Sequence, residues 1–150
     1  MKKAVYESAL RLLTRREHSQ LELSRKLTAK DFEPEIINIV IIQLTEEGWQ
    51  SDSRFAMSFT RHRINQGFGK LKIAAELNQR GISEFDCDSV LVDLGVSWNE
   101  VLERVYQKKY PPSDSISFKE KAKRTRFMVQ RGFSYQQIAA LFQRLMIRLQ

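Results

Sequence analysis

Apolar residues recur at helical spacing along almost the whole chain. Val5, Ala9 and Leu12 form the first stripe and predict a helix that ends near Ser19. Ser19 and Glu22 have the spacing of a capping box, in which each residue satisfies a backbone N–H near the other, and so predict the start of a second helix.

A third helix is predicted from Pro34, which suits the first turn of a helix, to the region before Gly48. The same order of three helices then recurs. A shift of 50 residues pairs Leu23 with Ile73, and a shift of 51 pairs Gly81 with Gly132. Gly81 and Gly132 fit helix C-caps, whereas the matching position in the first triplet is an aspartate, so we expect that cap to be made differently.

The repeat predicts an all-α protein built as an elongated array of three tandem three-helix, helix-turn-helix-like units. Each unit alone has a small apolar face, but stacked units share a core. We place the units at residues 1–49, 50–96 and 97–150, with the segment 110–117 as a longer loop.

Charge is distributed in blocks that follow this repeat, within a net charge of +7. Residues 1–30 carry eight bases and three acids, residues 53–83 six bases and one acid, and residues 101–133 nine bases and three acids. The intervening segments, 31–52 and 84–100, contain acidic residues but no lysine or arginine. If the units stack in similar orientation, the basic helices would merge into one positive face, which suits nucleic acid or a protein-coated nucleic acid.

The most basic segment is residues 118–126, in which five of nine residues are basic. At helical spacing Lys119, Lys123 and Arg126 share one face, whereas Phe118 and three other residues, Ala122, Thr125 and Val129, are expected to face inward. This segment predicts contact with phosphates or an acidic surface. The alternative is a solvated helix whose long side-chain stems cover the core.

A second basic segment begins at Arg61 and continues through a loop with Gly67 and Gly69 into a predicted helix carrying Lys70 and Lys72. Free amides at a helix N-terminus bind anions, which is one interpretation. The other is a plain turn between helices. The candidate residues of the basic face are Arg54, Arg61, Arg63, Lys70, Lys72, Arg80, Lys119, Lys121, Lys123, Arg124, Arg126 and Arg131, with Arg15, Arg16, Arg25 and Lys26 as secondary candidates.

Candidate catalytic chemistry is not apparent. His18 and His62 lack the partners of a zinc site, and Cys87, the only cysteine, falls on an apolar helix face. We therefore expect no enzyme activity, cofactor or metal. The basic N-terminus is not followed by an apolar stretch and no apolar run is long enough to span a bilayer, so we expect a cytoplasmic protein without membrane contact.

The chain resembles the RecX family of recombination regulators. The resemblance rests on three segments, Ala9–Leu27, Gly48–Ile82 and Lys121–Phe133. The chain has Gln50-Ser51-Asp52 where the family often has a hydrophobic residue and two aspartates, and Gly69-Lys70 where it often has Gly-Pro.

The resemblance implies tandem three-helix repeats and a regulatory protein, expected as a monomer, that binds in the groove of the RecA–DNA filament. It further implies inhibition of the RecA ATPase and strand exchange in recombinational repair and the SOS response, with weaker contact to single- or double-stranded DNA. Two alternatives remain open from the residues: a direct DNA-binding protein with a recognition helix beginning near Lys70 or Lys119, and a helical adaptor whose charge only keeps it soluble.

Overall fold

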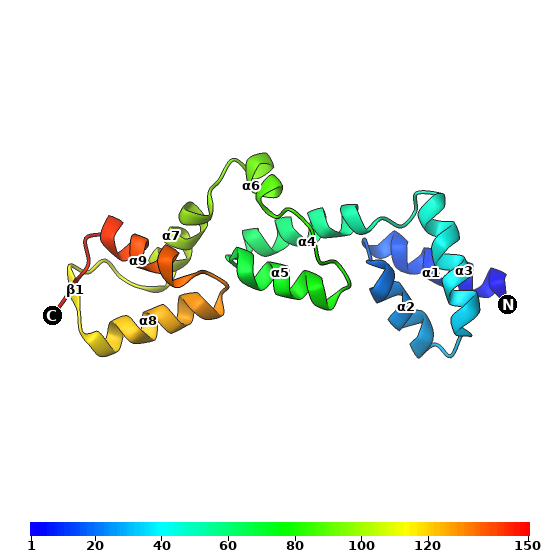
Figure 1. Ribbon diagram of the computed structural model, residues 1–150, viewed down its shortest axis with the longest axis horizontal. Coiled ribbons are helices and arrows are strands. Elements are labelled where there is room, and N and C mark those ends of the chain that lie inside the picture. Colours follow the sequence, from blue (N-terminus) through cyan, green and yellow to red (C-terminus); the bar gives the residue numbers. More distant parts are fainter. The chain divides into compact units, whose positions relative to one another are not determined.

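The computed structural model describes residues 1–150 and contains nine helices and two very short strands (Figure 1). The all-α prediction in three-helix groups is confirmed. In chain order the elements are α1 (Lys2–Arg15), α2 (Gln20–Ala29), α3 (Pro34–Glu46), α4 (Asp52–Asn65), α5 (Lys70–Gln79), α6 (Asp88–Leu94), α7 (Trp98–Lys109), β1 (Ser115–Ile116), α8 (Phe118–Gln130), α9 (Tyr135–Arg144) and β2 (Arg148–Leu149).

Serine caps begin several of these helices. The predicted box at α2 is present: the Ser19 hydroxyl accepts from the Glu22 N–H, and the Glu22 carboxylate accepts from the Ser19 N–H. Ser134 and Gln137 form a second such box at α9. Because each box satisfies backbone donors that the first turn leaves unpaired, these helix starts are fixed locally.

The turns that follow the second helix of each triplet share one left-handed backbone conformation. Gly81 and Gly132 adopt φ of +83° and +103°, as their C-cap prediction requires. Asp31, at the matching position, has φ of 65°. The expectation of a different cap in the first triplet is therefore wrong, since aspartate enters the left-handed region more readily than most residues.

The chain divides into two compact units. The first comprises residues 1–59 and 77–85. Within it α1, α2 and α3 pack on one another around Val5, Leu23, Leu27, Val40 and Leu44, all almost fully buried. The division runs through α4 and α5, so the second triplet contributes to both units.

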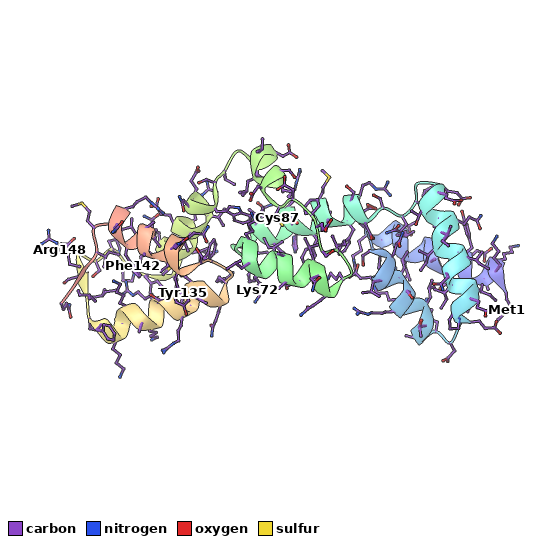
Figure 2. The ribbon with its side chains drawn as sticks, viewed as in Figure 1. Met1, Lys72, Cys87, Tyr135, Phe142 and Arg148 are labelled. Atoms are coloured by element: carbon purple, nitrogen blue, oxygen red, sulfur yellow. The ribbon has the colours of Figure 1, made fainter.

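The second unit comprises residues 60–76 and 86–150. Here α9 packs against α7 and α8, and the rings of Tyr106 and Phe142 meet edge to face with centroids 5.8 Å apart. Cys87 is buried immediately before α6, and Phe142 lies on α9 (Figure 2). Burial raises the pKa of the Cys87 thiol, which fits the predicted packing role.

The segment predicted as a long loop before α8 contains a strand. β1 pairs in parallel with β2 at the end of the chain, through Arg148 N–H to Asp114 O and Gln150 N–H to Ile116 O. Hydropathy periodicity could not predict two-residue strands, because their pairing joins distant parts of the sequence.

Candidate functional site

The most accessible group of predicted binding residues lies on α8. Ser117 caps this helix by accepting from the Glu120 N–H at 3.1 Å. Lys119, Lys123 and Arg126 then follow at helical spacing, all are exposed, and none forms an ion pair. We call these three residues the α8 ridge. Three unpaired cations on one helix face form a surface suited to phosphates or carboxylates.

Arg124, in contrast, is turned into the protein and only 7% exposed. Its guanidinium donates to Glu120 Oε1 at 2.9 Å and to the Tyr106 hydroxyl at 2.7 Å, and lies 4.4 Å from the centre of the Tyr110 ring. Burial alone lowers the pKa of Arg124, but these two hydrogen bonds outweigh it and raise the pKa. The hydrogen bond from Arg124 lowers the pKa of Glu120. Arg124 is thus a buried structural cation.

The predicted inward face of α8 is wrong at Phe118, which is 77% exposed. The helix instead buries Met128 and, one turn earlier, Arg124. Arg124 can be buried because the hydroxyl of Tyr106 accepts a hydrogen bond from its guanidinium, and hydropathy alone does not reveal such a partner. Lys121 is half-buried, with its ammonium 5.4 Å from the centre of the Phe142 ring.

Three further predicted residues gather around Phe68 in the second unit. The guanidinium carbons of Arg63 and Arg131 and the ammonium of Lys72 lie 5.1, 4.8 and 5.0 Å from the centre of this ring. Lys72 projects from α5 (Figure 2). Arg63 also pairs with Glu76 at 2.9 Å. The structure therefore brings these cations together, but around an aromatic ring and partly neutralised.

The second basic segment, residues 61–72, holds two other predicted cations. Arg61 is exposed, and Lys70 forms an ion pair with Asp88 at 3.1 Å.

Two of the backbone amides at the start of α5 are already hydrogen-bonded and are not available to an anion. The Gly69 N–H donates to the Arg131 carbonyl at 2.7 Å, and the Leu71 N–H donates to the Gly132 carbonyl at 3.1 Å. A Cβ at Gly69 would lie only 2.5 Å from the Gly132 oxygen, so glycine is needed for this close approach. Of the two interpretations of this loop, the contacts favour the turn between helices.

The candidates in the first unit are held in contacts of their own. Arg54 donates to Glu17 at 2.9 Å and to the Gly48 carbonyl at 2.8 Å. Arg80 lies 3.6 Å from Glu22 and 4.7 Å from the centre of the Phe59 ring. The ion pairs of both arginines join the second triplet to the first, so neither guanidinium is without an acidic partner.

The secondary candidates follow the same trend. Arg16 pairs with Glu22 at 3.1 Å, Arg25 donates to the Gln79 carbonyl at 3.1 Å, and the Lys26 ammonium lies 3.1 Å from His18 Nε2. Arg15 is exposed. Gln50, at the position where the chain departs from the usual family pattern, is buried and donates to the His18 carbonyl at 3.2 Å.

Three cations on α7 were not predicted as binding residues: Arg104, Lys108 and Lys109. With Arg131, these side chains line a cavity of about 530 Å³ inside the second unit. The four-residue spacing of Arg104 and Lys108 on one helix face was an available signal. The basic residues of 118–126 are closer together in the sequence and were therefore the stronger signal.

No group of three or more His, Cys, Asp or Glu side chains could hold a metal ion. None of the helices combines the length and the apolar character needed to cross a membrane.

Comparison with known proteins gives matches along the chain. Family models for the first, second and third three-helix domains of RecX match residues 6–44, 51–91 and 99–142. A regulatory protein RecX of Pseudomonas fluorescens strain SBW25 is 42% identical over 92% of this chain and 89% of its own length. A RecX of Pseudomonas syringae pathovar tomato is 38% identical over the same shares.

Solved structures agree in fold. The crystal structure of RecX from Lactobacillus salivarius superposes with a TM-score of 0.71 at 24% identity and covers 96% of both chains. A second crystal structure, of a regulatory protein RecX, gives a TM-score of 0.76 at 21% identity over 95% of this chain and 71% of the other. Three family-model matches in chain order, together with relatives more than 40% identical over nine-tenths of the sequence, show that the chain belongs to the RecX family of regulatory proteins.

Proposed function

We propose that this protein regulates the recombinase RecA by binding in the groove of the RecA–DNA filament, where it limits ATP hydrolysis and strand exchange. Membership of the RecX family carries the proposal, because the family resemblance implies this role. The protein acts by binding and not by catalysis, in the cytoplasm, during recombinational repair and the SOS response.

The α8 ridge supports a polyanionic partner. Lys119, Lys123 and Arg126 are exposed on one face without an ion pair. A filament of protein on DNA offers phosphates and repeated protein surfaces, to which such cations add sequence-independent affinity. Contacts through these side chains weaken as salt rises, because binding to phosphates releases counterions.

Direct reading of DNA sequence by a helix-turn-helix receives less support. Recognition helices contact bases mainly with their N-terminal residues. The N-terminus of α5 is covered by the carbonyls of Arg131 and Gly132. The ridge on α8 offers two lysines and one arginine, which bind phosphates whatever the DNA sequence. DNA binding is therefore the weaker, phosphate-directed part of the proposed function.

The experiment is the steady-state ATPase of RecA on single-stranded DNA with substoichiometric amounts of this protein added. The proposal expects the rate to fall at ratios well below one protein per RecA, because one bound protein affects more than one protomer. An unchanged rate would contradict it. Filter binding without RecA separates the alternative: tight DNA binding combined with an unchanged ATPase would favour a direct DNA-binding protein.

A further inference from the structure

The cavity in the second unit combines apolar walls with cations. Ile64, Val101, Val105 and Phe127 contribute apolar surface to it, and its volume of about 530 Å³ falls in the range of ligand-binding pockets. The cavity is lined by residues of α4, α6, α7 and α8 and by the turns that follow α4, α6 and α8. A site of this size can accept one large side chain together with its neighbouring backbone.

The charge around the cavity has one sign. Four cationic side chains line it, and none of its lining residues is acidic. Arg104 and Lys108 lie four residues apart on α7, both are exposed, and neither forms an ion pair. Cations beside low-dielectric apolar walls attract anions more strongly than the same cations on an open surface.

The other two cations are already engaged. The Lys109 ammonium lies 3.9 Å from the centre of the Phe127 ring, and Arg131 donates to the Gln66 carbonyl at 2.9 Å. Arg104 and Lys108 are therefore the cations available to a ligand.

The walls favour a peptide over a nucleotide. Phe127 is the aromatic residue of the lining. Its ring is contacted by the Lys109 ammonium, by the Arg131 guanidinium at 5.5 Å, and by the Tyr110 ring in a T-shaped arrangement with the centroids 5.9 Å apart. Bases of single-stranded nucleic acids bind chiefly by stacking on open aromatic faces. The remaining apolar walls are aliphatic and suit a leucine-like side chain.

We propose that this cavity binds an acidic peptide segment of a partner protein, with one large apolar side chain inside and its flanking carboxylates on Arg104 and Lys108. The inference goes beyond the proposed function, since it requires a ligand of this chemistry and neither RecA nor DNA. The contact would pair apolar burial with ion pairs at the rim, the usual anatomy of a peptide site.

The test is fluorescence anisotropy of a labelled synthetic peptide in which one leucine is flanked by glutamates, titrated with the full chain. We expect saturable binding that is weakened about tenfold or more by the double variant R104E/K108E, because two rim ion pairs become repulsions. The double variant K2E/K3E makes the same change of charge at exposed positions on α1, outside both the cavity and the α8 ridge, and serves as the matched control. Thermal unfolding of each variant checks that the fold is kept.

Two further ligands make the outcome decisive. A peptide with serine in place of the leucine should bind distinctly more weakly, since it leaves the apolar walls unfilled. Equal binding of the two peptides, equal losses in the two double variants, or no binding of the leucine peptide would each overturn the inference. An oligothymidylate of matched charge is the second ligand. If it binds more tightly than the peptide and R104E/K108E abolishes that binding, the inference is also overturned, because the site would then be one for nucleic acid.

Discussion

The backbone N–H of Gly69 donates to the carbonyl oxygen of Arg131 over 2.7 Å, and so ties the start of α5 to the turn between α8 and α9. With the bond from the Leu71 N–H to the Gly132 carbonyl, two backbone donors at the start of α5 have their acceptors in another triplet. In α2 the corresponding role belongs to the side chain of Ser19, which caps its own helix. The second and third triplets are thus joined by backbone hydrogen bonds that need a glycine at the contact.

Replacing Gly69 by alanine tests this junction. The added Cβ would lie 2.5 Å from the Gly132 oxygen, so the two backbones must separate and their hydrogen bonds lengthen. We expect a loss of about 1–3 kcal/mol in the free energy of unfolding, measured by urea denaturation. The exposed neighbour Leu71, changed to alanine, should shift stability by no more than about 0.5 kcal/mol. An unchanged midpoint for Gly69→Ala would show that the contact is not needed.

Arg124 gives a second prediction, because its guanidinium is buried between Glu120 and Tyr106. Arg124→Met removes the charge but leaves the Tyr106 hydroxyl without this donor, and we expect unfolding to become easier by about 1–3 kcal/mol. Lys123→Met, at the exposed next position, is the matched control and should cost no more than about 0.5 kcal/mol. Chemical denaturation of both variants checks the difference, and equal stabilities would mean that Arg124 has no structural role.

His18 makes stability depend on pH. The residue is 2% exposed, its Nδ1 lies 3.0 Å from the Arg16 carbonyl, and its Nε2 lies 3.1 Å from the Lys26 ammonium. Burial, reinforced by the positive charges of Arg16 and Lys26, lowers the pKa of His18 in the folded protein despite the hydrogen bond to the Arg16 carbonyl. The unfolded chain then binds the proton more readily than the folded one.

The free energy of unfolding should therefore be highest above about pH 6.5, the pKa of a histidine in the unfolded chain. It should fall as the pH drops below that value, because the unfolded chain then takes up the proton more readily. His18→Gln should flatten this slope between about pH 7 and pH 5.5, a range above the usual titration of carboxylates. His62→Gln, at an exposed position, should leave the slope as it is. Urea midpoints across this range provide the measurement, and a slope that survives His18→Gln would assign it to other groups.

Much of the fold could be predicted from local signals. Ser19 with Glu22, Pro34, and the glycines at 81 and 132 mark helix ends through interactions within a few residues, and the structure places them as predicted. The β1–β2 pair and the Gly69–Arg131 contact join distant segments, and periodicity carries no information about them.

The candidate site was predicted less completely, for a related reason. Exposure of a cation depends on whether a partner lies nearby in space. Lys119 and Arg124 look alike in sequence, yet Tyr106 and Tyr110, from the preceding helix and its end, bring Arg124 inside while Lys119 stays in solvent. The cations of α7 line a cavity that also involves residues of α4 and α8, so the sequence of α7 alone does not indicate a binding site.

The most direct test of the proposed function compares two triple variants as inhibitors of the RecA ATPase on single-stranded DNA. K119Q/K123Q/R126Q removes the charge of the α8 ridge, and K2Q/K3Q/R11Q removes the same charge from exposed positions on α1. With the fold of both verified by circular dichroism, the account predicts that the ridge variant needs at least about tenfold more protein for half-inhibition, while the control inhibits like the unmodified chain. Equal inhibition by the two variants would contradict the role of the ridge, and an absence of inhibition by the unmodified protein would contradict the proposed function itself.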